Sequence, residues 1–451
     1  MRKIEHRTWI CLLIAGLLAA GLLVFIVLFF KDGGQWASAS FNRHLYSSSG
    51  SLLSGRLLDR EGNVLSQVED GARVISGSAE QRTAMLHVTG DLQGKIATGA
   101  LTVFADRLTG YNPVLGAAAI QAGGGDVTLS IDSGCQLAAW RALNGRKGAA
   151  ALYNYETGEI LCMVSAPSYD PLNVPDNLES DPAYEGAYIN RVLRASFTPG
   201  SIMKTVTLHA AMEELPDLFD RTWTCTGSTQ IGGELVTCTA AHGTQSIGQA
   251  FSNSCNCVFG QLAVELGADT LGRYVEQSGL TRSYSVDGIS TTPSSIPLDG
   301  LSEGQLAWAG IGQAQDLVNP LSMMVYMGAI ANGGRAAVPS LIGRDGASLI
   351  PGSWGVRRTG TLIDAGTAET LAQLMSDNVT YNYGSSRFGD LDVCAKSGTA
   401  EVGGGQNPHA WFAGFVRDEA HPYAFIVLVE NGGGGSAAAG DVAAAMLAAA
   451  A

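Results

Sequence analysis

Residues 196–204 read SFTPGSIMK, and an apolar periodic run follows them. Proline and glycine placed ahead of such a run indicate a helix N-terminus. Ser201 and Lys204 would then share one helix face, one turn apart. A serine hydroxyl becomes an effective nucleophile when a base takes its proton, and a lysine amine can be that base if burial lowers its pKa. Chance also produces Ser-x-x-Lys pairs, so a surface lysine one turn from an N-cap serine is the alternative.

A second polar motif, Ser254-Cys255-Asn256, lies further along the chain. A serine and an asparagine two residues apart in a loop can point the same way. The hydroxyl can then relay a proton, and the amide can hold a substrate amide. By itself the motif is equally typical of a turn or a helix cap.

The third motif is Lys396-Ser397-Gly398-Thr399, which follows the strand-like residues 393–395. Gly398 removes a side chain where another backbone could approach closely. A substrate peptide could add beside such an edge strand through main-chain hydrogen bonds. Thr399 could bind a carboxylate, and Lys396 would supply positive potential. The alternative is an ordinary strand that begins with a turn.

Lysine is rare in this chain, which makes two of its positions informative. Only six of the 27 basic residues are lysines, and Lys204 and Lys396 are two of the six. Arginine cannot act as a base in a protein, so a base position must stay lysine.

Composition excludes several classes of protein. Hydrophobic residues make up 46% of the 451 residues and charged residues 15%, which excludes intrinsic disorder. The formal net charge of −14 argues against nucleic-acid binding, which needs clustered basic residues. The length predicts two or three domains.

Residues 8–30 form an uncharged apolar run of 23 residues, long enough to cross a bilayer as a helix. The alternative is a cleaved signal peptide, for which Ala37-Ser38-Ala39 resembles a cleavage site. Arg2, Lys3 and Arg7 precede the run. The positive-inside rule therefore predicts a cytoplasmic N-terminus and everything after residue 30 outside.

The remaining chain divides into a short region, 31–124, and a larger one, 125–451, after a flexible-looking join at 122–125. Residues 57–65 predict a hairpin, and residues 149–153 and 159–165 a second one. We also expect strands at 127–131, 410–415 and 423–429, and helices at 135–143 and 437–451. Strands at both ends with helices between them predict an α+β fold, with an antiparallel sheet layered with helices.

The eight cysteines show no Cys-x2-Cys spacing, so no metal site is expected. Cys225 and Cys238 flank the turn-forming residues 231–233 and could face each other across two strands. A disulfide between them and a pair of small buried side chains are both open.

Taken in order, Ser-x-x-Lys, Ser-x-Asn and Lys-Ser-Gly-Thr resemble the signature of penicillin-binding proteins and serine β-lactamases. The surroundings are similar to class B, monofunctional penicillin-binding proteins, with residues 56–65 resembling their pedestal hairpin. One departure is Ser54-Gly55-Arg56, where the class has Arg-Gly before the hairpin. Other matching stretches are TGEIL (157–161), APSYDP (166–171), SFTPGS (196–201), GQ (312–313), NPL (319–321), ANGG (331–334), KSGTAE (396–401) and HAWFAGF (409–415).

The resemblance implies a penicillin-binding transpeptidase fold at 125–451, a pedestal at 31–124, a transmembrane helix at 8–30 and a cytoplasmic tail at 1–7. It implies a D,D-transpeptidase that cross-links peptidoglycan stem peptides, releases D-Ala and is acylated by β-lactams. It also implies a glycosyltransferase partner in the membrane and requires no metal or organic cofactor. We expect no glycosyltransferase domain within the chain.

The resemblance also assigns roles to the motif residues. Ser201 would attack the D-Ala-D-Ala carbonyl, and Lys204 would take its proton. Ser254 would relay a proton to the leaving amine, while Asn256 would position the substrate amide. Lys396 would hold the proton network. Ser397, Gly398 and Thr399 would bind substrate, with Thr399 at its carboxylate.

Three alternatives compete with this interpretation. An anchored serine β-lactamase needs a water-activating group, and no Glu-x-x-x-Asn segment lies between Ser254 and Lys396. A β-lactam-sensing receptor needs a cytoplasmic output domain, and seven residues precede the apolar run. A non-catalytic cell-wall scaffold would tolerate loss of Ser201.

Overall fold

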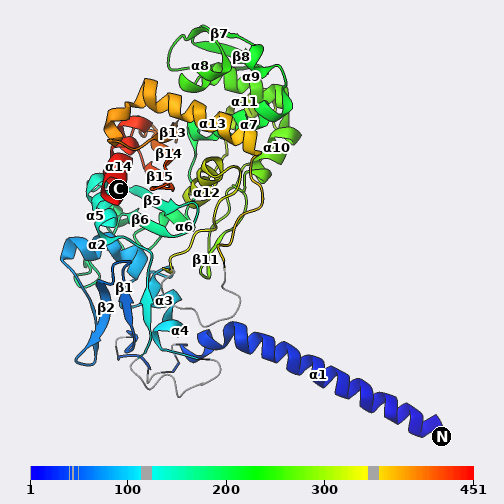
Figure 1. Cartoon of the computed structure of the whole chain (residues 1–451), viewed down its shortest axis with the longest axis vertical. Coiled ribbons are helices and arrows are strands. Elements are labelled where there is room, and N and C mark those ends of the chain that lie inside the picture. Colours follow the sequence, from blue (N-terminus) through cyan, green and yellow to red (C-terminus); the bar gives the residue numbers. More distant parts are fainter. Residues whose placement is uncertain (1, 40, 43–44, 49, 113–123, 344–354) are drawn as a thin grey trace. The chain divides into compact units, whose positions relative to one another are not determined.

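The computed structural model describes residues 2–39, 41–42, 45–48, 50–112, 124–343 and 355–451 (Figure 1). They form two compact units. The first comprises the described residues up to Leu58, with Asn63–Ser76 and Thr89–Val127; the second comprises Asp59–Gly62, Gly77–Val88 and the described residues from Thr128 to Ala451. In the expected join at 122–125, residues 122 and 123 lie outside the described residues.

The first unit begins with α1 (Arg2–Ala37), which contains the whole expected apolar run. Its segment Ile4–Ala37 is long and apolar enough to cross a membrane, and among the described residues none buries its most apolar window. This helix is consistent with a single-pass membrane anchor.

The rest of the first unit contains a small antiparallel sheet. β1 (Arg56–Leu58) pairs with β2 (Val64–Glu69), which confirms the predicted hairpin. The strand expected at 127–131 is shorter, because the chain leaves this sheet after β4 (Asp126–Thr128) and Leu129 instead bridges to Ile342. The strand order is β3-β2-β1-β4, and the remaining elements are β3 (Ala72–Ile75), α3 (Ala100–Val103) and α4 (Ala105–Leu108).

The second unit is built on a five-stranded sheet in which all neighbours are antiparallel. Its order is β13-β14-β15-β5-β6, so β13 is an edge strand in the described part of the chain. The predicted hairpin and the two late strands are confirmed. The strands are β5 (Gly148–Asn154), β6 (Ile160–Ala166), β13 (Val393–Ala400), β14 (His409–Val416) and β15 (Tyr423–Val429).

Helices cover both faces of this sheet, which gives the predicted α+β layering (Figure 1). On one face lie α5 (Ser133–Leu143) and α14 (Gly435–Ala450), both close to their expected bounds. On the other face, α12 (Pro320–Ala331) packs on β14 and β15, and α13 (Ala365–Asn378) packs on β13. The strands are nearly continuous buried runs because both faces are covered.

A helical region follows the Ser-x-x-Lys motif and contains two small hairpin-like sheets. The helix α9 packs on α7 and α11 within this region. Its elements are η4 (Gly200–Met203), α7 (Lys204–Glu214), η5 (Leu218–Asp220), β7 (Trp223–Cys225), β8 (Ser228–Ile231), β9 (Glu234–Thr237), β10 (Gly243–Gln245), α8 (Ile247–Ser252), α9 (Asn256–Leu266), α10 (Ala268–Gln277) and α11 (Glu303–Ala309). The second unit also contains α2 (Ala79–Thr89), whose Thr89 falls in the first unit, and η3 (Pro182–Tyr184), α6 (Arg191–Arg194), β11 (Ser285–Val286), β12 (Ile289–Ser290), η6 (Val379–Tyr383) and η7 (Ser385–Phe388).

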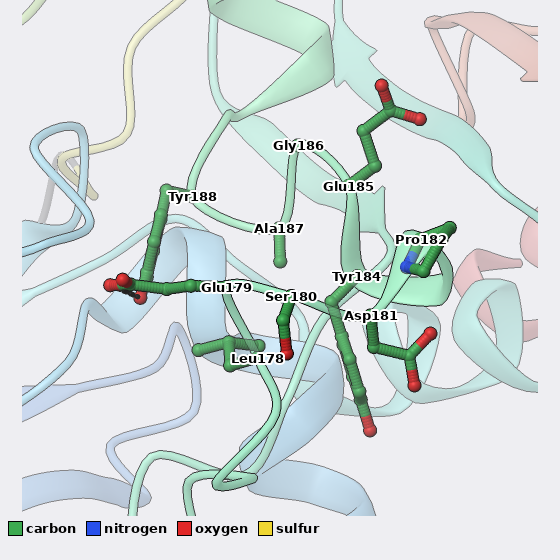
Figure 2. Close-up of a pocket in the computed structure, with 10 residues that line it drawn as sticks. All are labelled: Leu178, Glu179, Ser180, Asp181, Pro182, Tyr184, Glu185, Gly186, Ala187 and Tyr188. Atoms are coloured by element: carbon green, nitrogen blue, oxygen red, sulfur yellow. Dashed lines mark hydrogen bonds between the residues drawn. The ribbon is translucent and has the colours of Figure 1, made fainter.

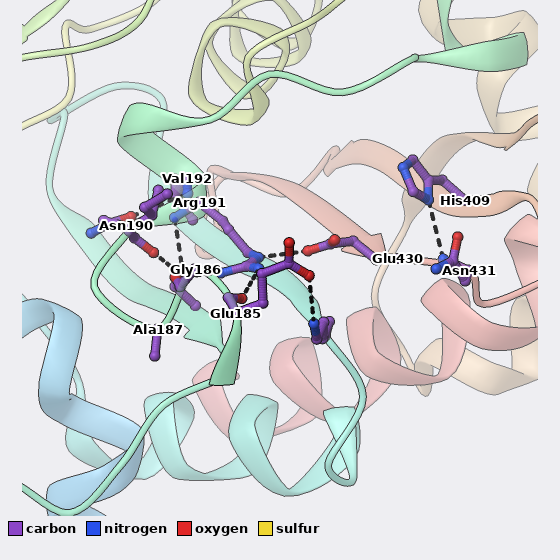
Figure 3. Close-up of polar contacts among 12 residues, drawn as sticks. Glu185, Gly186, Ala187, Asn190, Arg191, Val192, His409, Glu430 and Asn431 are labelled. Atoms are coloured by element: carbon purple, nitrogen blue, oxygen red, sulfur yellow. Dashed lines mark hydrogen bonds and ion pairs between the residues drawn. The ribbon is translucent and has the colours of Figure 1, made fainter. Parts of the chain in front are cut away.

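A largely buried ion pair fastens α6 to the end of β15. Arg191 Nε lies 2.5 Å from Glu430 Oε1, and the Arg191 guanidinium also donates to the carbonyl of Gly186 at 2.9 Å (Figure 3). The pair joins segments that are far apart in the sequence, at the residue directly after the sheet strand.

Candidate active site

Ser201 lies in the 3₁₀ turn η4, immediately before α7. The predicted helix N-terminus is therefore present, but its first turn is wound more tightly than an α-helix. Gly200 has a φ of +56°, and a Cβ atom there would lie 2.5 Å from the carbonyl oxygen of Thr399. Glycine thus allows the turn that carries Ser201 to contact the β13 backbone directly.

Two further contacts hold this turn in place. The Gly200 amide donates to the Gly312 carbonyl at 2.8 Å, and the Trp411 indole on β14 donates to the Thr198 carbonyl at 2.8 Å. The Gly-Gln and HAWFAGF stretches noted in the sequence therefore support the segment around Ser201.

The Lys204 amine contacts the three other polar residues of the first two motifs, Ser201, Ser254 and Asn256. Its Nζ atom lies 3.1 Å from Ser201 Oγ and 3.2 Å from Ser254 Oγ. It also donates to the backbone carbonyl of Ser254 at 2.5 Å and to Asn256 Oδ1 at 2.7 Å. Lys204 is thus aimed at the Ser201 hydroxyl by three oxygen atoms from one short segment.

Lys396 reaches the same centre from the sheet. Its Nζ atom donates to Ser254 Oγ at 3.0 Å and to the Ser397 carbonyl at 3.0 Å. The Ser254 hydroxyl therefore lies between two lysines. Ser254 has a φ of +52°, which is uncommon for a residue with a side chain and is typical of functional sites.

Both lysines are fully buried, and this burial controls their protonation. Desolvation lowers the pKa of Lys204 to about 7, while nearby cysteines oppose the shift. Burial and then the charge of Lys204 hold the pKa of Lys396 well below its usual value. A Lys204 amine that is partly neutral near pH 7 can accept a proton from Ser201.

An aromatic ring lies close to each of the two lysine amines, and no motif in the sequence predicted either ring. The Phe259 ring lies 5.7 Å from Lys204 Nζ, and the Phe251 ring lies 5.8 Å from Lys396 Nζ. Both residues lie within a few positions of the Ser-x-Asn motif, on α9 and α8. Their closeness in sequence to this motif is the feature that could have predicted a place in the site.

The third motif lies within β13, which continues the strand-like residues 393–395, and its side chains have three different environments. Gly398 is buried, and a Cβ atom there would lie 2.8 Å from the Pro199 carbonyl oxygen. Ser397 contacts Tyr383, whose hydroxyl lies 3.0 Å from Ser397 Oγ. Thr399 is exposed, and its hydroxyl accepts from the Gly435 amide at 3.3 Å. No sequence pattern had pointed to Tyr383.

Asn256 is held by hydrogen bonds at both ends of its side-chain amide. Besides accepting from Lys204, its side-chain NH₂ group donates to the Thr237 carbonyl at 2.7 Å. The structure thus brings Ser201, Lys204, Ser254, Asn256 and Lys396 into one hydrogen-bonded network, beside the edge strand that carries Ser397, Gly398 and Thr399.

A cavity of about 510 Å³ lies elsewhere in the second unit, where the chain loops through residues 178–188. Figure 2 shows that its lining comes from this one loop, including Glu179, Asp181 and Tyr184. None of the motif residues lines it. The chemistry therefore centres on the lysine network and not on this cavity.

The cysteines are arranged differently from the sequence prediction. The 228–237 hairpin forms, but Cys225 lies on β7, which pairs with β10, so it does not face Cys238 across that hairpin. All eight cysteines fall within the described residues as free thiols. Four of them converge despite the absence of a Cys-x2-Cys spacing: Cys225, Cys238, Cys255 and Cys257.

Comparison with known proteins shows which family this chain belongs to. The family model for the penicillin binding protein transpeptidase domain matches residues 148–450. The peptidoglycan D,D-transpeptidase PbpA of Mycobacterium tuberculosis is 31% identical over 366 residues, which cover 73% of this chain and 70% of that protein. PbpA of Mycolicibacterium smegmatis is 29% identical over 376 residues, with the same shares.

Solved structures give the same result. The crystal structure of PBPA from M. tuberculosis superposes with a TM-score of 0.77 and 26% identity, covering 88% of this chain and 99% of that one. Its penicillin G acyl-enzyme complex superposes with a TM-score of 0.75 and 25% identity, covering 89% and 100%.

Proposed function

This chain belongs to the penicillin-binding protein transpeptidase family, as a class B member, and we propose that Ser201 is the nucleophile of its reaction. It is a serine-type peptidoglycan D,D-transpeptidase. The observation that carries the assignment of Ser201 is its contact with the buried Lys204 amine at 3.1 Å. A buried lysine with a lowered pKa is the group that can activate a serine hydroxyl without histidine.

Acylation follows from this geometry. Ser201 Oγ attacks the carbonyl carbon of the penultimate D-Ala of a donor stem peptide, and neutral Lys204 takes the hydroxyl proton. The C–N bond to the terminal D-Ala breaks, and an ester to Ser201 forms. The Ser201 amide and an amide of β13 would stabilise the oxyanion, since Gly200 and Thr399 bring these two backbones together.

Ser254 is placed to return the proton to the leaving amine. Its hydroxyl lies 3.2 Å from Lys204 Nζ and 3.0 Å from Lys396 Nζ, so a proton can pass from Lys204 through Ser254 to the departing nitrogen. An acceptor amine then attacks the ester, with the same groups acting in reverse. Lys396 keeps the Ser254 hydroxyl oriented throughout.

Substrate binding is assigned to β13 and Asn256. The outer edge of β13 offers main-chain groups to an extended stem peptide, and the exposed Thr399 hydroxyl suits the terminal carboxylate. Asn256 would position the substrate amide through the second hydrogen of its NH₂ group, since the first is donated to the Thr237 carbonyl. Its observed contact holds Lys204, and we assign it that positioning role as well.

We further propose the cellular arrangement implied by the sequence. Residues 8–30 would cross the cell membrane with residues 1–7 in the cytoplasm, residues 31–124 would form a pedestal, and residues 125–451 would act on the outer side. The basic residues before the apolar run support this orientation. A membrane glycosyltransferase would supply the glycan strands to be cross-linked.

The experiment is covalent labelling of the detergent-solubilised full chain with a fluorescent penicillin, beside Ser201→Ala. We expect a band that persists for hours in the wild type and is absent in the variant, because β-lactams acylate the substrate serine. Rapid loss of the label with drug hydrolysis would indicate a β-lactamase. Equal labelling of the variant would exclude Ser201.

A further inference from the structure

Four cysteines from three separate segments meet next to the second motif. Cys225 ends β7, Cys238 directly follows β9, and Cys255 and Cys257 lie on either side of Asn256 at the start of α9. Their four Sγ atoms all lie within 4.8 Å of one another. The fold of residues 223–257 therefore brings thiols from three segments to one point.

The sulfur spacing fits a tetrahedral metal site. Zn–S bonds of about 2.3 Å in a tetrahedron place the sulfur atoms about 3.8 Å apart. Cys238 Sγ lies 3.6 Å from Cys255 Sγ and 3.5 Å from Cys257 Sγ. Bonded disulfide sulfurs are about 2.05 Å apart, so these two pairs are spaced as ligands of a shared ion.

The surroundings resemble those of a closed structural site. Cys225, Cys255 and Cys257 are at most 2% exposed, while Cys238 is half-buried. The Cys257 amide donates to Cys238 Sγ at 3.3 Å, and such N–H···S contacts stabilise metal-bound thiolates. With four protein ligands and little exposure, no coordination position is left for substrate.

We propose that Cys225, Cys238, Cys255 and Cys257 bind one Zn²⁺ ion as a Cys₄ site. Four soft thiolate ligands in a tetrahedral arrangement suit Zn²⁺. Zn²⁺ has no redox chemistry, so the ion itself would be stable on the outer side of the membrane. On binding, each thiol releases one proton to solvent, and the resulting tetrathiolate complex carries a net charge of −2. No oxidant or reductant is required.

The position of the site gives it a consequence for catalysis, and this part rests on the proposed function. Cys255 lies between Ser254 and Asn256, and both of these residues bind Lys204. A metal at Cys255 and Cys257 would tie this segment to β7 and β9 and would hold Ser254 at its unusual φ of +52°. The four cysteines are therefore positioning residues for the lysine network and do not touch substrate.

The first test measures metal and thiols in the detergent-solubilised full chain, purified without chelator. We expect about one zinc per chain by elemental mass spectrometry, as a structural site requires. Cobalt added after chelation should give the absorption of a tetrahedral thiolate complex. A chain without zinc, with a mass deficit for disulfides among these four cysteines, would overturn the proposal. Bound iron in place of zinc would overturn the choice of metal.

The second test compares Cys225→Ala with Cys162→Ala, since Cys162 is buried in β6 and away from the cluster. We expect Cys225→Ala to lose about 10–100-fold or more in zinc affinity, while Cys162→Ala keeps it. Because Cys225→Ala could fail to fold, the wild type treated with a zinc chelator and then reloaded provides a second comparison. Unchanged zinc in Cys225→Ala would overturn the ligand set.

The rate of acylation by penicillin, measured with and without zinc, tests the metal site and the proposed function independently. We expect slower acylation in chelated wild type and recovery on adding zinc. Full-rate acylation without zinc would overturn the positioning role and leave the transpeptidase assignment standing. Zinc bound by a chain that penicillin never acylates at Ser201 would support the metal site while contradicting the proposed catalytic role.

Discussion

A Cβ atom on Gly398 would lie 2.8 Å from the carbonyl oxygen of Pro199, so the edge strand and the approach to Ser201 are in direct backbone contact. Gly398→Ala must push β13 and this turn apart, because moving either backbone away from the new methyl group costs free energy. We expect a loss of about 1–3 kcal/mol in folding free energy. We also expect much slower penicillin acylation, because a small displacement of reacting groups costs about 100-fold.

Gly272→Ala is the matched control for this substitution. Gly272 lies within α10, where an added Cβ would meet only Leu298 Cδ1, at 3.9 Å. Alanine should raise helix stability there by about 1 kcal/mol and leave acylation unchanged. Wild-type acylation by Gly398→Ala, with thermal unfolding also unchanged, would contradict the importance of this contact.

Lys204→Arg tests whether Lys204 acts as a base or only as a positive charge. Arginine keeps the charge but cannot lose its proton, so we expect acylation to fall by about 10²–10⁴-fold. Stopped-flow measurement of the penicillin reaction would check this. Lys147→Arg is the control, since Lys147 is outside the network. Normal acylation by Lys204→Arg, in a folded protein, would rule out the base role.

The fold was largely predictable because its signals are local. The strands expected at 149–153 and 159–165 are mainly apolar runs around a turn, and they form within one residue of those bounds. The helix α5 begins at Ser133, two residues before its expected start, with Asp132 as its N-cap. The strand at 127–131 was overestimated because apolar alternation does not reveal that Leu129 changes partners. Local patterns report burial, whereas pairing depends on the whole fold.

The candidate site was predictable only as separate motifs. Ser201 and Lys204 are one turn apart, so their contact follows from helix geometry. The meeting of Lys396 with Ser254, the Tyr383 hydroxyl beside Ser397 and the cysteine cluster all depend on chain segments brought together by tertiary packing. The spacing of residues along the sequence does not predict these contacts.

Asp316 provides a prediction about stability and pH. Its side chain is 1% exposed, and neither carboxylate oxygen has a hydrogen-bond partner among the described residues. Burial raises the pKa of Asp316 well above its usual 3.8. As pH rises above 3.8, the unfolded chain releases this proton while the folded chain retains it, so folding stability falls with increasing pH.

Asp316→Asn removes this titration and should stabilise the protein by about 1–3 kcal/mol near pH 8, with little effect near pH 4. Thermal unfolding of the two proteins across this pH range measures the difference. The exposed Asp299→Asn serves as the control and should show no such divergence. A constant difference at all pH values would mean that Asp316 is not a buried acid.

The Arg191–Glu430 ion pair provides the last prediction. The two side chains are only 7% and 17% exposed, so loss of one leaves the other charge poorly solvated. Arg191→Met should therefore cost about 3 kcal/mol. Glu430→Met combined with it should recover part of this loss, because no unpaired charge is then left. Recovery is incomplete because the Gly186 and Glu185 carbonyls also lose their donor.

The neighbouring Lys147–Glu185 pair is the control for this experiment. Its atoms are 3.5 Å apart, and Glu185 is 83% exposed, so Lys147→Met should change stability by less than about 1 kcal/mol. Thermal unfolding of all four proteins in the same detergent provides the comparison. If the double variant is as unstable as Arg191→Met alone, the carbonyl contacts of Arg191, and not its charge pair with Glu430, fasten α6 to β15.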